Sequence, residues 1–413
     1  MASEPAKTTK ESHKPTGGKP KGKRSALLGA MFLMATSAVG PGFITQTTNF
    51  TIEIGAAFAF AIGVSILVDI AVQMNVWRVI GVSGLRGNEL ANKIAPGLGW
   101  LLALLIVTGG LAFNIGNIAG TGLGLDAMLG MNPTVGAVIS AALAIGVFMS
   151  KRAGMALDRI VVVLGGLMIL ITTIIAFTTD PPVAEAAVQT FAPDTIDFLI
   201  ITTLIGGTVG GYITYAGAHR LIDAGETGPS HVRSIATGSV VGILVTGVMR
   251  TIFFLAILGV VSQGANLDPS NPAASAFEFA AGEFGLRAFG VIFWAAALTS
   301  VIGASYTSAS FLTTSKTSER TRSLITVIFI IVCAFLFVVL GQAPVTLLLF
   351  VGAFNGVILP LGFTVILYAA WRRRDLLQGY VYPKWLLIIG VLAWLLTLFL
   401  GFQSLSSLGT LWT

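Results

Sequence analysis

Long apolar segments separated by short polar ones make up almost the whole chain. From about residue 25 onward, stretches of about 18 or more mainly apolar residues recur, which is the length that a helix needs to cross a bilayer. Because the connections are short, the pattern predicts an all-α integral membrane protein with one transmembrane domain at residues 25–405. The eleven predicted spans are 25–54, 56–78, 97–125, 133–150, 156–178, 195–221, 234–261, 284–313, 321–341, 343–371 and 384–404.

The composition supports this class of protein. Of the 413 residues, 55% are hydrophobic and 10% are charged, whereas soluble domains carry about 25% charged residues. Residues 1–24 are rich in Lys, Ser, Thr and Pro without an apolar period, so we expect a disordered basic tail there. The formal charge of +6 does not indicate a nucleic-acid partner, because positive charge in a membrane protein mostly reports topology.

The chemistry-bearing residues exclude several classes of function. Cys333 is the single cysteine, and His13, His219 and His231 all lie near charged loops. A cysteine- or histidine-based metal centre within the membrane is therefore not expected. The spans and long loops contain no Ser-His-Asp set and no phosphate-binding loop, so we expect neither an enzyme nor a bound cofactor. No obligate protein partner is evident.

Basic residues occupy alternate connections, and this sets the predicted orientation. Because basic loops stay in the cytoplasm, we predict a cytoplasmic N-terminus and, with an odd number of spans, an extracellular C-terminus in the plasma membrane. The connections after even-numbered spans carry Arg78, Arg86, Lys93, Lys151, Arg152, Arg159, Arg220, Arg233, Lys316, Arg320, Arg322, Arg372, Arg373, Arg374 and Lys384, and those after the fifth and seventh carry Asp180, Glu185, Asp194, Asp268, Glu278 and Glu283.

Two spans contain helix-breaking sequences near mid-membrane. The first has Gly40-Pro41-Gly42, and the sixth, five spans later, has "GGTVGG" at residues 206–211. Unwound backbone at membrane depth survives only where it is buried or lines a cavity, and paired breaks point to the substrate site of a transporter. The alternative is that the glycines only let neighbouring helices pack closely.

The paired breaks predict two five-helix repeats of inverted topology, at about residues 25–178 and 195–371, followed by an extra helix at 384–404. A half-helix that stops at a break presents free carbonyl groups and the negative end of its dipole. Two such ends, near Gly40 and Gly207, would form a cradle for a cation.

The sequence around both breaks resembles the Nramp family of divalent metal transporters, which have the leucine-transporter (LeuT-like) fold. The family pattern Asp-Pro-Gly-Asn in the first span aligns with Gly40 to Phe43, and Ala-Thr-Val-Met-Pro-His in the sixth aligns with Gly207 to Tyr212. The Asp-Leu-Ala-Glu pattern on the family's proton route aligns with "NIGN" at residues 114–117. The frame is kept, but most of the reactive side chains are replaced.

These replacements indicate the Nramp-related magnesium transporters as the branch that this chain most resembles. Gly210 in place of Met removes the soft ligand that favours transition metals. Gly40 in place of Asp removes a direct ligand, which suits an ion such as Mg²⁺ that keeps several waters. Asn114 and Asn117 cannot titrate. The resemblance therefore implies uptake of divalent cations, chiefly Mg²⁺ with Mn²⁺ tolerated, as partly hydrated ions, by alternating access and without proton coupling.

The candidate site residues come from both breaks and their neighbours. For four of the candidates, hydrogen bonding between helices is an equal alternative to a role in the site: Tyr212, Thr208, Asn114 and Asn117. For Phe43 the alternative is plain packing. The metal-site candidates are Gly40, Phe43, Gly207, Thr208, Gly210 and Tyr212, and the pathway candidates are Thr45, Gln46, Asn49, Asp69, Asn114 and Asn117.

Two further observations leave alternatives open. Asp69 and Arg250 are the deepest charges in the spans, so Asp69 is predicted as a cation ligand, as half of a bridge with Arg250, or as a vestibule residue. Hydroxyl groups in the eighth span, such as Ser305 and Ser308, resemble sodium-binding residues of other transporters of this fold. The rival function is a LeuT-fold transporter of an amino acid or another organic solute coupled to Na⁺. An uncoupled channel is less consistent with paired breaks.

Overall fold

The computed structural model describes residues 40–313 and 317–409, and all of the regular structure in this part of the chain is helical. The predicted tail at residues 1–24 and the inner half of the first span lie outside the described residues. The elements are α2 (Pro41–Ile54), η1 (Gly55–Ala57), α3 (Phe58–Ser83), α4 (Gly87–Ile94), α5 (Leu98–Leu129), α6 (Pro133–Met149), α7 (Lys151–Thr178), α8 (Val183–Gln189), α9 (Phe198–Thr208), α10 (Ile213–Asp223), η2 (Pro229–His231), α11 (Val232–Ser262), α12 (Pro272–Leu312), α13 (Glu319–Leu340), α14 (Pro344–Arg372) and α15 (Lys384–Leu408).

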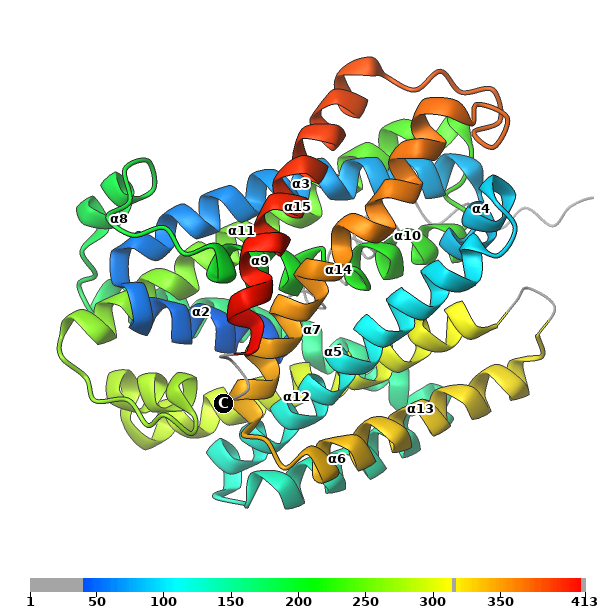
Figure 1. The fold of residues 1–413 in the computed structure, drawn as a ribbon. Coiled ribbons are helices and arrows are strands. Elements are labelled where there is room, and N and C mark those ends of the chain that lie inside the picture. The colour runs from blue at the N-terminus through cyan, green and yellow to red at the C-terminus, as the bar shows by residue number, and fades with distance from the viewer. Residues whose placement is uncertain (1–39, 314–316, 410–413) are drawn as a thin grey trace, which may run out of the picture.

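The long helices form one bundle in which α5 and α12 make the most extensive contact (Figure 1). Small residues bring these two backbones together: a Cβ on Gly124 would lie 2.6 Å from the Trp294 nitrogen, and a Cβ on Gly290 would lie 2.5 Å from the Met128 nitrogen. Glycine on each helix is therefore needed for this approach, as in other tightly packed membrane helices. These positions show that many glycines here do serve packing.

Each predicted span corresponds to a helix or to a helix pair in the structure. The sixth is divided into α9 and α10, as predicted, and α2 is separated from α3 by Gly55, which has a φ of +55°. Eight of the described helices are long and apolar enough to cross a membrane, or nine when the bent pair α7–α8 counts as one span. The all-α membrane fold is thus confirmed, while the number of eleven crossings stays a prediction.

Three helical segments were not predicted. α4 and α8 are short helices within connections, and α12 begins at Pro272, twelve residues before the predicted start of the eighth span. Within α12, Gly282 has φ +63° and ψ −156°, so it divides the outer part of the helix from the rest. The hydropathy pattern missed these segments because they carry charged residues among apolar ones.

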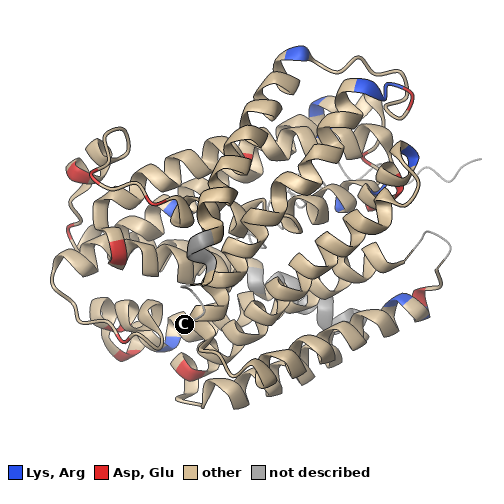
Figure 2. Cartoon of the chain, in the orientation of Figure 1, with Lys and Arg blue, Asp and Glu red and all other residues tan. Residues whose placement is uncertain are grey.

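Charge is distributed unevenly along the bundle. In Figure 2 most Lys and Arg ribbon segments lie at the end that holds α4 and the start of α13, while acidic segments dominate the opposite end near α8. The basic end contains three ion pairs: Arg86–Asp223 at 3.2 Å, Arg373–Asp375 at 2.8 Å and Arg322–Glu319 at 3.9 Å. This segregation is what the alternating basic connections predicted; which end faces the cytoplasm stays a prediction.

Candidate functional site

The sixth span is interrupted at residues 209–212, between α9 and α10. The Val209 nitrogen donates the last α9 hydrogen bond to the Ile205 carbonyl, and helix resumes after the Gly210 carbonyl accepts from the Ile213 nitrogen at 2.8 Å. Within the break, the Gly211 nitrogen donates to the Asn355 carbonyl of α14 at 3.2 Å. The unwound backbone is therefore supported by a neighbouring helix, as buried polar groups in a membrane protein require.

The described part of the first span begins at Gly40. Gly40 is extended, with φ −87° and ψ −174°, and α2 begins at Pro41. Proline fits the first helical position because it has no amide hydrogen to leave unpaired. The Pro41 ring packs against α5 where Gly120 leaves room, since a Cβ there would lie 2.4 Å from Pro41 Cβ. The start of α2, which has no side-chain cap and carries the positive end of the helix dipole, is thus fixed in the bundle interior.

Gln46 connects the first span to the second break. The side chain is fully buried, and its Nε2 donates to the Leu348 carbonyl of α14 at 3.4 Å. A Cβ on Gly207 would lie 2.5 Å from Gln46 Oε1, and a Cβ on Gly352 would lie 2.2 Å from Nε2. The space beside Gly207 is therefore occupied by the Gln46 amide, whose Oε1 has no hydrogen-bond partner.

Four other polar residues of α2 bond within their own helix: Thr47, Thr48, Asn49 and Thr51. Thr47 donates to the Phe43 carbonyl at 2.7 Å, and Asn49 donates to the Thr45 carbonyl at 2.8 Å. Such bonds to the preceding turn satisfy hydroxyl and amide groups locally. Of the pathway candidates on α2, Gln46 alone reaches across to another described helix through a side-chain hydrogen bond.

Two buried charges lie between the breaks. Asp69 of α3 is 1% exposed and Arg250 of α11 is 2% exposed. The Asp69 carboxylate interacts with the side chain of Thr208, the last residue of α9, and electrostatically with Arg250. The Arg250 guanidinium lies over the Phe43 ring of α2, 4.5 Å from its centre. Phe43 and Thr208, both predicted site residues, therefore meet the same pair of charges.

Asp69 and Arg250 do not form a direct ion pair. Among the described residues, no side-chain nitrogen and carboxylate oxygen of this pair lie within 4.0 Å. Asp69 Oδ1 and the Nε and Nη2 atoms of Arg250 are buried without a hydrogen-bond partner. Unpaired buried charges are destabilising in a membrane interior, so their retention points to a functional role.

The two asparagines of α5 are fully or almost fully buried, and one of them links helices. Asn114 Nδ2 donates to Ser305 Oγ of α12 at 2.8 Å. This bond agrees with the alternative that Asn114 serves hydrogen bonding between helices. Asn114 Oδ1, Asn117 Nδ2 and Ser308 Oγ have no partner. The α5–α12 interface thus retains unused polar groups, and these are available to a bound solute or to water.

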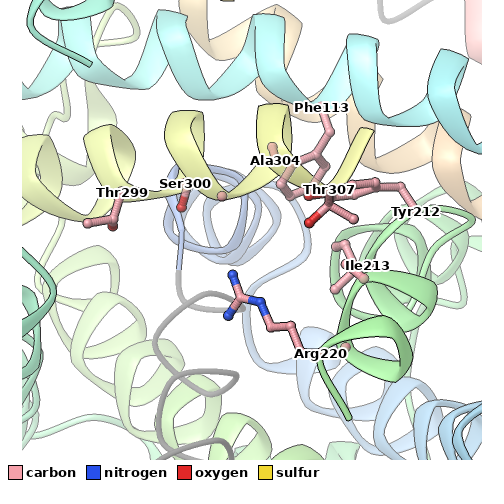
Figure 3. Close-up of a pocket in the computed structure, with 11 residues that line it drawn as sticks. Phe113, Tyr212, Ile213, Arg220, Thr299, Ser300, Ala304 and Thr307 are labelled. Carbon is pink, nitrogen blue, oxygen red and sulfur yellow. The ribbon is translucent and has the colours of Figure 1, made fainter. Parts of the chain in front are cut away.

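Tyr212, at the end of the second break, forms the wall of a cavity between α5, α10 and α12 (Figure 3). The cavity holds about 50 Å³, enough for a few water molecules. The Tyr212 ring lies beside Phe113, with ring centres 5.9 Å apart, and Figure 3 shows Arg220 extending from α10 towards α12. Thr307 and Ser300 supply hydroxyl groups to the opposite wall.

Sequence inspection gave no role to α14, which the structure places against the second break. A Cβ on Gly206 would lie 1.9 Å from the Gly352 carbonyl and 2.3 Å from the Gly356 nitrogen. Asn355 between them donates to the Gly109 carbonyl of α5 at 3.2 Å. The stretch "GAFNG" at residues 352–356 has the small-xxx-small spacing that is typical of close helix contacts. This spacing could have predicted the close contact of α14 with the second break.

The arrangement has little of a conventional metal centre. The described residues contain no group of three or more His, Cys, Asp or Glu side chains that could hold a metal ion. Backbone groups, amides, hydroxyls and the charges of Asp69 and Arg250, which make no direct ion pair, surround the breaks instead. Such a site can bind a hydrated ion or a small polar solute between two half-helices.

Comparison with known proteins gives the family. A family model described as "Natural resistance-associated macrophage protein-like" (Nramp) matches residues 31–407. The chain is 50% identical over 406 residues to the uncharacterized membrane protein YcsG of Bacillus subtilis, covering 98% of this chain and all of that protein.

Solved structures agree on the fold. A mutant of the manganese transporter of Eremococcus coleocola superposes with a TM-score of 0.70 at 15% identity, covering 95% of this chain and 89% of the other. MhsT in complex with L-phenylalanine superposes with a TM-score of 0.57 at 18% identity, covering 94% and 98%. The resemblance to the Nramp family and the expected LeuT-like fold are thus confirmed, whereas the magnesium branch stays a prediction, and the chain belongs to the Nramp family.

Proposed function

We propose that this protein is a transporter that takes up divalent cations, chiefly Mg²⁺ with Mn²⁺ tolerated, by alternating access. The ion would bind as a partly hydrated species between the two breaks, close to Gly40, Gly207 and Gly210. Membership of the Nramp family and the fold shared with a manganese transporter support the class of substrate. The plasma membrane, with the N-terminus inside, is the proposed location.

The observation that carries the proposal is the ligand chemistry of the two breaks. They offer backbone carbonyls, the Gln46 amide oxygen and the Thr208 hydroxyl, which are hard oxygen groups. The break residues themselves, 40–43 and 206–212, include no Met or His; the thioether-bearing Met168 and Met249 line a cavity beside Phe43. Mg²⁺ prefers oxygen and keeps several of its waters, whereas soft ligands select transition metals.

Proton independence follows from the side chains at the expected proton route. Asn114 and Asn117 are amides, and Asn114 is engaged with Ser305. Amides do not exchange protons in the accessible pH range. Uptake can instead be driven by an inside-negative potential, which supplies about 2.3 kcal/mol per charge per 100 mV, or about twice that for a divalent ion.

Uptake by proteoliposomes with a simultaneous internal pH reading tests both parts of this proposal. We expect Mg²⁺ to enter with an imposed inside-negative potential and the lumen to keep its pH. Preferred entry of Fe²⁺ together with acidification would overturn both the selectivity and the proton independence.

A second candidate is the transport of an amino acid or another organic solute coupled to Na⁺. The specific observation in its favour is Arg250, a buried cation between the breaks, which suits a carboxylate better than a metal ion. The proteoliposome experiment separates the candidates when amino acids, with and without Na⁺, replace Mg²⁺ as the external solute. Na⁺-dependent uptake of an amino acid without Mg²⁺ uptake would favour this candidate.

A further inference from the structure

Arg250 presents an unused hydrogen-bonding edge inside the bundle. Arg250 as a whole is 2% exposed, so in this conformation its guanidinium is closed off from bulk water and lipid headgroups. Nε and Nη2 both lack a hydrogen-bond partner. These two atoms lie on one side of the planar guanidinium, where their N–H groups point in parallel. That pair is the fork that binds both oxygens of a carboxylate.

The face of the same guanidinium is already occupied. The Phe43 ring lies against it at 4.5 Å, and Phe43 is held in turn by Phe253, whose ring centre is 6.4 Å away. Stacking on an aromatic ring fixes the plane of an arginine and leaves its edge free for bidentate binding. The fork therefore has a defined direction before a ligand arrives.

Asp69 does not use this fork in the structure. It interacts with Arg250 electrostatically, but its Oδ1 has no hydrogen-bond partner. Its other contact is the side chain of Thr208 at the end of α9. The pair is thus close enough for partial charge compensation, and it leaves the bidentate position open.

The surroundings of Arg250 connect it to both breaks. Phe43 is the third residue of α2, whose N-terminus has no side-chain cap and carries the positive end of the helix dipole. Thr208, which contacts Asp69, ends α9 at the second break. Arg250 therefore lies beside the region that alternating access would expose, and the free end of α2 adds to its attraction for a negative group.

We propose that Arg250 binds the carboxylate of a small organic acid between the two breaks. The ligand is small, of amino-acid size or below, because Arg250 is enclosed in the bundle at 2% exposure. This inference does not rest on cation transport: the carboxylate binds with or without Mg²⁺, and a bound carboxylate would offset the charge of Arg250 when a divalent cation is present.

Ligand binding to the purified full-length protein in nanodiscs tests the proposal. The probes are acetate, L-lactate, L-alanine, L-glutamate and succinate, each measured separately by calorimetry and thermal stabilisation without Mg²⁺. L-lactamide and L-alaninamide are matched controls that lack the carboxylate. We expect saturable binding of at least one carboxylate, with at least tenfold weaker binding of its amide. If none of the five binds, or if chloride binds equally well, the proposal is wrong.

Variants identify the residue responsible. Arg250→Gln is expected to abolish carboxylate binding, and Arg250→Lys is expected to raise the Kd at least tenfold, because an ammonium group lacks the fork. Arg233→Gln is the control, since Arg233 lies on the same helix but is exposed. Unchanged binding in a folded Arg250 variant would overturn the assignment. Should both Arg250 variants fail to fold, the carboxylate-against-amide comparison on the unmodified protein still decides.

The same experiment distinguishes a structural role. If Arg250 serves only as the partner of Asp69, no carboxylate binds, and Asp69→Asn and Arg250→Gln lower the melting temperature by similar, non-additive amounts. That result would overturn the proposed carboxylate site and leave Mg²⁺ uptake to be judged by its own assay.

Discussion

Gly206 and Gly207 are adjacent residues of α9, yet alanine at the two positions should act on different properties. At Gly206 the new Cβ would meet backbone atoms of α14, 1.9 Å from the Gly352 carbonyl and 2.3 Å from the Gly356 nitrogen. At Gly207 it would meet the end of the flexible Gln46 side chain at 2.5 Å. Backbone cannot yield without moving a helix, whereas a side chain can rotate away.

The magnitudes follow from these contacts. Alanine gains about 1 kcal/mol over glycine in a helix interior, while overpacking against a fixed neighbour costs about 1–3 kcal/mol. Gly206→Ala should therefore be destabilising by about 1–2 kcal/mol net, because its clash falls at the high end of that range. Gly207→Ala should be close to neutral, since it loses only the long Gln46–Leu348 hydrogen bond, worth about 1 kcal/mol.

Function should respond in the opposite order. Gly207→Ala displaces the Gln46 amide, which lies between the breaks, and we expect Mg²⁺ uptake to fall at least tenfold although the protein folds. Thermal unfolding in detergent and proteoliposome uptake measure the two effects, with Gly146→Ala as the control, because a Cβ there meets nothing within 4 Å. Normal uptake by Gly207→Ala, or an unaltered melting temperature of Gly206→Ala, would refute the reasoning.

Three other substitutions have defined outcomes. Gly40→Asp places a carboxylate where the Nramp family pattern has an aspartate. It should lower Mg²⁺ uptake by proteoliposomes, and Mn²⁺ uptake should not rise to the Mg²⁺ uptake of the unmodified protein. Tyr215→Phe removes the buried hydroxyl that donates to the Gly362 carbonyl at 2.8 Å and should lower the unfolding free energy by about 1–3 kcal/mol, seen as a lower melting temperature. Gly282→Ala forces a side chain into φ +63° and should be destabilising by about 1–2 kcal/mol, while Gly401→Ala, which meets only one atom at 3.7 Å, should not.

The position of the second break could be predicted because local sequence determines it, whereas the first break stays a prediction because the residues before Gly40 lie outside the described part of the chain. Pro41 cannot continue a helix that precedes it, and paired glycines at 206–207 and 210–211 weaken the helix between them. The structure places the second break at residues 209–212, so Gly207 itself remains helical. Local propensity thus gave the place of this interruption to within three residues.

The contacts across the site could not be predicted, because they join residues far apart in the chain. Arg250 and Phe43 are 207 positions apart, and only the crossing of α2 with α11 brings the guanidinium over the ring. Likewise, the helical period did not show which polar side chain of α2 would form a hydrogen bond to another helix. The decision lies with Gly207 and Gly352, whose missing side chains leave space for Gln46 and not for its neighbours.

Asp69 is the residue whose substitution separates the two uses of the site. Asp69→Asn keeps the size of the side chain but leaves the Arg250 charge uncompensated. Two unit charges about 4 Å apart at an effective dielectric of about 20 interact by about 4 kcal/mol. Because Asp69 and Arg250 make no ion pair within that distance, we expect a smaller effect, on the order of a hundredfold in affinity.

The sign of that change differs for the two ligands. Mg²⁺ uptake should fall by up to about a hundredfold, because the remaining positive charge of Arg250 repels a cation. Carboxylate affinity should rise, because the competing negative charge is gone. Uptake measured in proteoliposomes and binding measured in nanodiscs would show opposite changes. A parallel loss of both would mean that Asp69 supports the fold around Arg250, and the electrostatic account of the centre would have to be abandoned.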